Sequence, residues 1–391
     1  DSTVRAVLML IDLTTNAEDL SRRLDVDNSD SPNAIAFSPL GDYAFISLQG
    51  NNQLGVIDVL DFMQQNSPGT LQARWGTGLA PQAILMDEAS GTVYSKDFMG
   101  RSVTAFDAAA FLNSGSLNVP STTITTVGSE KLDPEVLLGK QIFYNAGDPR
   151  MSAEGYISCA SCHLDGGHDG RTWDFTNRGE GFRNTTDLRG RRGTNHGNVH
   201  WSANFDEIQD FENDIRGFFG GSGFLSDVEF ASVSDPLGIP KAGLSADLDA
   251  LSAYLTSLGG TSLPRAPSRV GPGELSGAAL RGQAVFIAES CSTCHAPESN
   301  FTDRMMHNVG TLRTSSGQRL GGPLTGIDTP TLLGIHASAP YFHDGSAATL
   351  EDVFTLTGGR MVQAEDATLT GGAIAEDIEW YPMKEWHGTF V

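Results

Sequence analysis

Two copies of one short motif, Cys-x-x-Cys-His, contain every cysteine in the chain. They occupy residues 159–163 and 291–295. The spacing is typical of covalent haem c attachment, because two thiols one helical turn apart can each form a thioether with a haem vinyl group. The histidine that follows is then placed to ligate the iron. The sequence therefore predicts two haem c groups, held by Cys159, Cys162, His163, Cys291, Cys294 and His295.

Other uses of the cysteines explain less of the sequence. Two C-x-x-C pairs can hold a structural zinc ion, but then the histidine after each pair has no role. A disulfide would also leave both histidines unexplained. A similar five-residue segment that begins with Gly and ends with Phe precedes each motif, at residues 139–143 and 282–286. We therefore expect two related haem domains, each with a short helix leading into the attachment turn.

The composition limits the partners that the chain can have. The formal net charge of −23 argues against nucleic acid and anionic membrane surfaces, and no apolar run approaches a membrane span. A basic redox partner, a salty habitat or simply a solvated acidic surface would each suit this charge. Haem c is attached outside the cytoplasm, so we expect a periplasmic, extracellular or cell-surface protein. No signal peptide stands at Asp1, so it is expected to have been removed or to lie upstream.

Residues 1–127 carry a repeat of short predicted strands, and a strand predicted at residues 7–12 would close an earlier copy. Pro32 and Pro81 are 49 residues apart, and Gly50 and Gly100 are 50 residues apart. Four short strands in a period of this length are typical of a β-propeller blade, and the segment resembles YVTN-type propeller repeats. Two blades cannot close a ring, and open edges invite aggregation, so we expect the missing blades to come from the rest of the protein or from another chain. A small two-sheet β domain is the alternative.

The rest of the chain is predicted to be mostly helical. Asp133 and Pro134 are good N-terminal residues for one helix, and Ser245 caps another that has an apolar stripe. The fold class is thus multidomain α+β, with partial β-propeller blades followed by two mostly α cytochrome c-like haem domains. The predicted divisions are a partial propeller (1–127), a first haem domain (128–260), a linker (261–273), a second haem domain (274–360) and a truncated further element (361–391).

Several segments around the haem motifs resemble the bacterial di-haem cytochrome c peroxidase/MauG superfamily. The resemblance implies that the His163 haem meets hydrogen peroxide or another small oxidant. It also implies that the His295 haem receives electrons from a redox protein or a small donor. The matching segments, in family order, are residues 139–143, 148–152, 158–163, 169–171, 183–188, 301–303, 307–310 and 339–346.

The same resemblance implies roles for further residues. Trp201 would lie between the haems and conduct electrons, although it could instead be a core aromatic. Asn184, with the backbone carbonyls of Ser338 and Pro340, would bind a calcium ion, for which hard oxygen ligands are suited. A turn residue is the alternative for Asn184. His343 would lie near a haem propionate or Trp201.

The sequence departs from the family at the expected sixth ligand of the second haem. Relatives have Met or Tyr where this chain has Thr357, which is a poor iron ligand. Met361 could take over, and a thioether opposite histidine would raise the reduction potential. Alternatively Met361 is a core residue, and Met305, Met306 or no side chain ligates the iron.

The second departure concerns the acid that peroxide cleavage requires. Residues 220–223 read Gly-Gly-Ser-Gly where relatives have Asn-Pro-x-Glu. Peroxide heterolysis needs a base that takes a proton and returns it to the leaving oxygen. Glu207 and Glu212 are the nearest substitutes, or else they form a solvated acidic helix face. Three histidines could bind the distal side of the first iron and so block it, or could instead be surface histidines or histidines near the site that do not bind iron: His168, His196 and His200.

Two functions therefore compete at this stage. The first is an exported di-haem c-type oxidoreductase, in which electrons enter at the His295 haem and an oxidant reacts at the His163 haem. The second is an electron-transfer or docking cytochrome without peroxidase turnover. A non-redox propeller scaffold explains none of the haem residues.

Overall fold

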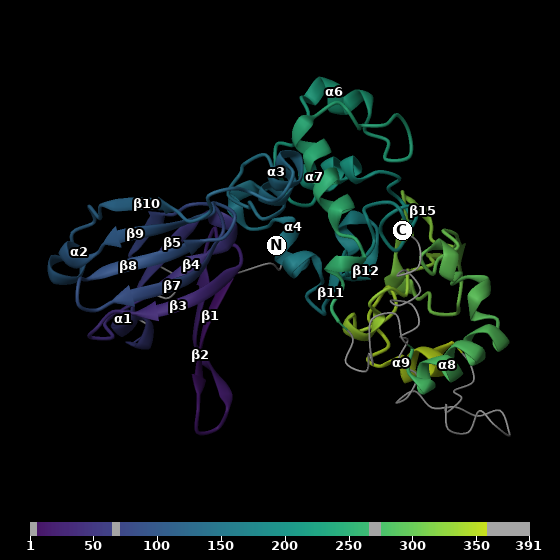
Figure 1. Ribbon diagram of the computed structural model, residues 1–391, viewed down its shortest axis with the longest axis horizontal. Helices are drawn as coiled ribbons and strands as arrows, with labels where there is room; N and C mark the ends of the chain where they lie inside the picture. The colour runs from purple at the N-terminus through teal and green to yellow at the C-terminus, as the bar shows by residue number, and fades with distance from the viewer. Residues whose placement is uncertain (1–5, 65–70, 266–274, 358–391) are drawn as a thin grey trace. The chain divides into compact units, whose positions relative to one another are not determined.

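The computed structural model describes residues 6–64, 71–265 and 275–357 (Figure 1). The described chain divides into two compact units. One contains residues 1–161 and 212–226, and the other contains residues 162–211 and 227–391. The predicted domain boundaries remain predictions, and the expected C-terminal element at residues 361–391 lies outside the described residues.

Two four-stranded antiparallel sheets form the β region of the first unit. Their strand orders, β3-β4-β5-β6 and β10-β9-β8-β7, follow the chain without crossovers. The strands are β3 (Pro32–Phe37), β4 (Tyr43–Leu48), β5 (Gln53–Asp58), β6 (Ala73–Gly76), β7 (Pro81–Asp87), β8 (Thr92–Asp97), β9 (Ser102–Asp107) and β10 (Ser121–Thr125). These sheets agree with the two predicted four-stranded repeats.

A short helix occupies the same place in each repeat. The helix α1 (Val59–Gln64) follows β5, and α2 (Ala109–Ser114) follows β9. Both helices lie at the same end of the sheets (Figure 1). The strand pattern alone did not predict them, and they show that the repeat extends beyond the strands.

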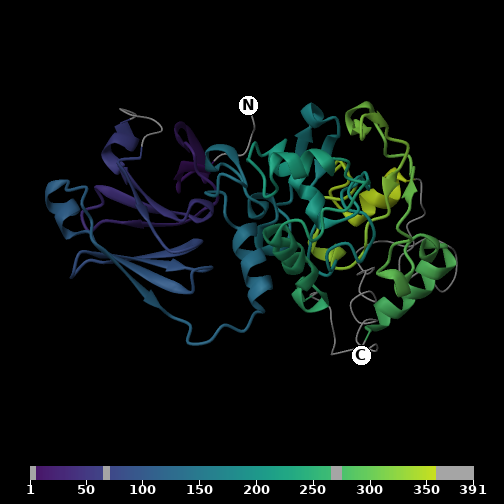
Figure 2. The same cartoon turned by 90° about the horizontal axis from the view of Figure 1, so that it is seen from above.

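Aromatic side chains fill the space between the two sheets, which form two layers in Figure 2. The Trp75 ring lies 5.4 Å from the Phe45 ring, 5.4 Å from the Phe106 ring and 5.5 Å from the Phe111 ring, measured between centroids. Tilted and edge-on pairs of this kind stabilise a core beyond their buried area. The alternating residues of the central strands supply this core because successive strand side chains point to opposite faces.

A hairpin covers the other face of the first sheet. It consists of β1 (Ala6–Asp12) and β2 (Ala17–Val26), whose Ala6, Leu24 and Val26 pack against β4 and β5. A strand at residues 7–12 was predicted, but β2 was not. Three successive layers suit neighbouring propeller blades, yet the strands of the described chain form no closed ring. The propeller assignment therefore remains a prediction.

The haem-motif region combines short helices with two-stranded sheets, so it contains more strand pairing than the sequence predicted.

The predicted helix caps are confirmed: the Asp133 side chain accepts a hydrogen bond from Glu135 N at 2.9 Å, and the Ser245 side chain accepts one from Leu248 N at 3.4 Å. No helix in the described ranges is both long and apolar enough to cross a membrane. The helices are α3 (Pro134–Phe143), α4 (Cys159–Cys162), α5 (Glu212–Arg216), α6 (Asp227–Ser232), α7 (Ala246–Ser257), α8 (Gly277–Ala288) and α9 (Leu350–Leu356). The paired strands are β11 (Thr172–Phe175) with β12 (Gly181–Asn184), β13 (Met306–His307) with β16 (Ile327–Asp328), and β14 (Gln318–Arg319) with β15 (Gly322–Pro323).

The inter-sheet core gives a direct stability prediction. Phe45 is 0% exposed in this core, whereas Phe37 on β3 is 53% exposed. Replacing Phe45 with Ala should lower the free energy of unfolding of the β region by about 3–5 kcal/mol, because it leaves a large cavity. Denaturant unfolding measures the loss. The Phe37→Ala variant is the control, and equal losses in both variants would contradict the assignment of the core.

Candidate functional site

The first Cys-x-x-Cys-His motif coincides with α4 and the histidine after it. Nδ1 of His163 lies 3.0 Å from the Thr186 carbonyl oxygen and 3.2 Å from that of Gly167. Because both partners are acceptors, Nδ1 carries the proton and Nε2 keeps its lone pair. Burial lowers the pKa of His163, which favours the neutral ring. This arrangement fits an iron-ligating histidine, whose second nitrogen usually donates to a carbonyl.

The second motif follows α8 in the same manner. A 3₁₀ turn, η7 (Cys291–Thr293), carries the first cysteine, and His295 N donates to Cys291 O at 2.9 Å. Nδ1 of His295 lies 2.9 Å from the carbonyl oxygen of Phe301. Burial lowers the pKa of His295 as well. Both predicted proximal histidines thus present a neutral ring with Nε2 available to iron.

The surroundings of the cysteines suit haem better than zinc. The four cysteines form no disulfide. Burial raises the pKa of the Cys159 thiol to about 12, which disfavours the thiolate that zinc requires. Cys291 packs beside an apolar cluster, as a porphyrin edge requires. The members of that cluster are Leu263, Phe286, Phe301, Leu332 and Leu333.

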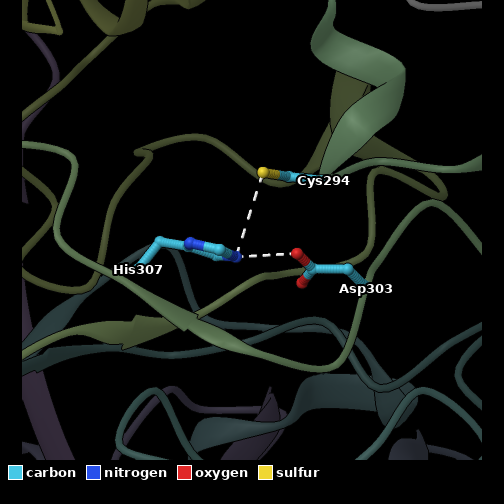
Figure 3. A group of neighbouring side chains, drawn as sticks. All are labelled: Cys294, Asp303 and His307. Carbon is cyan, nitrogen blue, oxygen red and sulfur yellow. Dashed lines mark hydrogen bonds and ion pairs between the residues drawn. The ribbon is translucent and has the colours of Figure 1, made fainter.

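One group of potential metal ligands lies at the second motif (Figure 3). Nε2 of His307 lies 2.7 Å from Oδ2 of Asp303 and 3.9 Å from Sγ of Cys294. A thioether at Cys294 would remove the thiolate that a metal ion needs. With haem attached, what remains of the group is an Asp–His pair beside the attachment point. Within the described chain, Cys294 is the only one of the four cysteines that belongs to a group of potential metal ligands.

Trp201 connects the segments that support the two histidines. Its Nε1 donates to the Asn184 carbonyl oxygen at 2.8 Å, two residues before Thr186, which accepts from His163. On the other side, its carbonyl oxygen accepts from Asp328 N at 2.9 Å. The half-buried indole thus lies in a hydrogen-bonded link between two distant parts of the sequence.

The link continues to the second histidine. The residue after Asp328 is Thr329, whose carbonyl oxygen accepts from Thr302 Oγ1 at 2.7 Å. Thr302 follows Phe301, whose carbonyl oxygen binds His295 Nδ1. A continuous path of covalent and hydrogen bonds therefore runs from His295 through Trp201 to His163.

The predicted calcium ligands are partly brought together. The Asn184 side-chain amide contacts the carbonyl oxygens of Pro340, at 2.5 Å, and Phe342, at 3.3 Å, while its own Oδ1 is buried without a hydrogen-bond partner. Turning this amide over would point Oδ1 toward the same carbonyls, an oxygen set of the kind that Ca²⁺ binds. The side chain of Ser338 instead donates to Ile335 O at 3.1 Å.

His343 is fully buried among polar groups that include Arg183. Its Nε2 is 2.7 Å from Ser316 Oγ, and the Arg183 guanidinium donates to the Ser316 carbonyl oxygen at 2.9 Å. His343 Nδ1 and Arg183 Nη2 are buried without hydrogen-bond partners, while Arg183 Nε forms an ion pair with Glu180 Oε2 at 3.4 Å. A haem carboxylate would satisfy such donors, which fits the predicted place of His343 near a propionate.

Both predicted acids are engaged with backbone groups. The Glu207 carboxylate accepts from the backbone N–H groups of Lys241 and Ala242. Glu212 is fully buried and accepts from Phe224 N and Leu225 N, each at 3.0 Å, and from Arg216 Nε at 2.7 Å. These contacts explain both residues as anchors of neighbouring loops, and their catalytic assignment remains a prediction.

The structure adds a buried acid that sequence reasoning missed. Glu180 binds the side chains of Ser202 and Asn204, on either side of Ala203. Burial alone would raise its pKa, but the positive charges of Arg178 and Arg183 help to hold the pKa below its usual value. Flanking arginines at positions 178 and 183 were the only sequence signal for this site.

The remaining predicted residues occupy separate places. His168 Nε2 lies 2.6 Å from Ala337 O, and His200 Nδ1 lies 2.8 Å from Asn204 Oδ1. Burial lowers the pKa of His196 to about 3 and that of His200 to about 4, so both rings are neutral. Met305 is largely exposed, whereas Met306 lies in β13. Thr357 follows α9, and Met361 lies outside the described residues.

Two attachment motifs with supported proximal histidines define a di-haem c-type cytochrome. Family models agree: residues 133–214 match "Di-haem cytochrome c peroxidase", and residues 326–358 match "RoxA-like, cytochrome c-like". Hydrazine synthase subunit gamma from Kuenenia stuttgartiensis is 30% identical over 254 residues, covering 54% of this chain and 67% of the relative. The chain therefore belongs to the same family as that subunit and carries a di-haem cytochrome c peroxidase domain.

Solved structures give further similarities. A structure of Kuenenia stuttgartiensis hydrazine synthase pressurised with xenon aligns at 26% identity with a TM-score of 0.40, covering 67% of this chain and 89% of that chain. A MauG-like protein associated with microbial copper homeostasis aligns at 22% identity with a TM-score of 0.42, covering 63% and 82%. Family membership implies oxidoreductase chemistry and covalently bound haem c.

The attachment sites are tested by removing the cysteines in pairs. The double variant Cys159→Ser/Cys162→Ser should lose one of two covalent haem groups, because the remaining motif is independent in sequence. The matched variant Cys291→Ser/Cys294→Ser should lose the other. A pyridine haemochrome assay and the intact mass measure the change, and unaltered haem content in either double variant would refute the assignment.

Proposed function

We propose that the chain is a di-haem c-type oxidoreductase in which electrons pass from the His295 side, by way of Trp201, to the His163 side, where peroxide or another small oxidant is reduced. Bound haem would supply the redox chemistry. The protein would hold the two groups through the four motif cysteines and the two proximal histidines.

The observation that carries this proposal is the two-sided contact of Trp201. Its indole N–H binds the backbone that supports His163, and its carbonyl oxygen binds the backbone that leads to His295. The indole N–H contact is specific to tryptophan, because an aromatic side chain that served only to fill the core would not need a hydrogen bond there, whereas the contact on the His295 side is made by the main chain. An electron path of this kind supports transfer between two sites rather than two independent cytochromes.

Polar residues of the same region would orient and satisfy the bound groups. Arg183 and His343 would hold a propionate, and Asn184 with the Pro340 carbonyl would hold a calcium ion. The proposed reduction consumes two protons and two electrons for each hydrogen peroxide and releases two waters. Glu207 and Glu212 stay candidates for the acid, and buried Glu180 joins them because it is charged and adjacent to His200.

Peroxide turnover tests the proposal directly. Mixing the reduced protein with hydrogen peroxide should oxidise two equivalents of donor for each peroxide consumed. Stopped-flow absorbance follows the donor and an independent assay follows the peroxide. A protein loaded with two haem groups that consumes no peroxide with any reduced donor would eliminate this function.

Electron passage through Trp201 gives a separate prediction. The Trp201→Phe variant keeps an aromatic ring but loses the indole N–H, so transfer between the haem groups should slow by roughly tenfold or more, equivalent to about 1.4 kcal/mol of barrier. Flash reduction followed at the two haem bands measures the rate. Trp173→Phe is the matched control, since Trp173 Nε1 donates to Asp169 Oδ2 at 2.9 Å and this hydrogen bond is not one of those that form the path. Equal rates in both variants would exclude the Trp201 path.

The second candidate is an electron-transfer subunit of a larger assembly. The similarity to a protein named as a subunit of hydrazine synthase favours it, and so does the engagement of Glu207 and Glu212 by backbone groups. Both irons would then be six-coordinate. A purely low-spin ferric spectrum that ignores added small ligands supports this candidate, and a high-spin component opposes it.

The remaining expectations belong to the same proposal. Covalent haem attachment implies export, so we place the protein in the periplasm or at the cell surface. The negative charge favours a basic redox partner. The β region would complete a propeller with blades from the rest of the protein or another chain.

A further inference from the structure

A buried carboxylate of the β region binds directly to the first attachment motif. Asp30 lies in the loop between β2 and β3 and is 2% exposed. Its Oδ1 accepts from Ser161 Oγ at 2.8 Å, and its Oδ2 accepts from Ser158 Oγ at 3.0 Å. These two serines lie on either side of Cys159. The carboxylate therefore holds both sides of the first haem cysteine.

This arrangement requires a carboxylate, because both side-chain oxygens of Asp30 accept hydrogen bonds from serine hydroxyl groups. An ionised carboxylate can only accept, so the Ser158 and Ser161 hydroxyl groups both donate to Asp30, and Ser161 Oγ also accepts from Ser158 N at 2.8 Å. A carboxylate accepts at both oxygens, whereas an amide accepts at only one. An asparagine could thus keep one of these hydrogen bonds in its present direction but not both.

The turn after β4 fixes Asp30 in place and also holds the haem-motif loop. Asn51 Oδ1 accepts from Asp30 N at 2.7 Å, and Asn51 Nδ2 donates to Gly155 O at 2.9 Å. A Cβ atom on Gly50 would lie 2.2 Å from Asp30 Oδ2, so only glycine permits this approach. Gly50 O in turn accepts from Gly147 N at 2.8 Å. The β region thus contacts the first haem segment at several points around one carboxylate.

The repeat itself does not require an acid at this position. In the second copy the position equivalent to Asp30, 49 residues on, is Leu79. The backbone contact is the same in both copies: Gly50 N donates to Asp30 O at 3.3 Å, and Gly100 N donates to Leu79 O at 3.0 Å. The copy that contacts the haem motif has a carboxylate, and the other has an apolar side chain.

We propose that Asp30 is a positioning residue for the first haem: it orders residues 158–161 so that Cys159 is held for thioether formation, and its negative charge lowers the reduction potential of that haem. The β region would thereby set the properties of one redox centre. The proposal rests on haem attachment at the first motif but not on peroxide turnover.

The two parts of the proposal have different physical causes. Ordering depends on the two serine hydrogen bonds, so it is lost when the carboxylate is truncated. The effect on potential depends on charge, because an anion stabilises the more positive ferric form. Burial raises the pKa of Asp30 to about 6, so the group is still charged at pH 8. Charge and geometry can therefore be separated with two substitutions.

The experiment compares Asp30→Ala and Asp30→Asn with a matched control, Asp97→Asn. Asp97 is equally buried in the β region and accepts from three hydroxyl groups, on Ser95, Ser102 and Thr104, none of them in a haem motif. Mass spectrometry of proteolytic peptides measures haem attachment at each motif separately. Spectroelectrochemical titration at pH 8 measures the two midpoint potentials.

The Asp30→Ala variant should show a several-fold loss of haem at the first motif and full attachment at the second. Asp30→Asn should retain more haem and raise the potential of the first haem only, while Asp97→Asn changes neither quantity. Full first-motif attachment in Asp30→Ala, or an unchanged first potential in Asp30→Asn, would overturn the proposal. An equal effect of Asp97→Asn would overturn it too. Absence of haem from the first motif of the unaltered protein would instead overturn the proposed function.

Discussion

The hydrogen bond from each proximal histidine to a backbone carbonyl is the interaction on which the functional site depends. His163 binds the carbonyl of Thr186, and His295 binds that of Phe301. Each bond fixes the tautomer and the orientation of the ring, so that Nε2 is available to a metal. The carbonyls themselves belong to the segments that Trp201 joins. The geometry of ligation and the path between the two sites are therefore consequences of the same backbone arrangement.

The β region has a structural connection to one of these sites. Its layered core consists of aromatic and aliphatic side chains packed between the sheets and the hairpin. Its loops, at Asp30 and at residues 50–52, reach the segment that carries the first motif. The Asp30 loop is held in place by hydrogen bonds from Asp30 N to Asn51 Oδ1 and from Gly50 N to Asp30 O.

Local patterns in the sequence predicted the features that depend on neighbouring residues. The paired strands of the repeat, the cap at Asp133 and the cap at Ser245 all appear where predicted, because turn residues and alternating apolar residues act over a few positions. The hairpin strand β2 was not predicted, since its sequence is rich in charged residues and its burial is partial. Glu180 and Asp30 were missed because an isolated acid shows no sign of burial until its partners are known.

The sequence by itself determined the cofactor chemistry, because the reactive thiols and the ligating histidine of each motif lie within five consecutive residues. Tertiary structure decided which other residues serve those motifs. Asp30 and Ser158 are separated by 128 positions, and Asn184 and Pro340 by 156. No local pattern encodes such pairs, because chain packing brings them together only when the whole unit has folded.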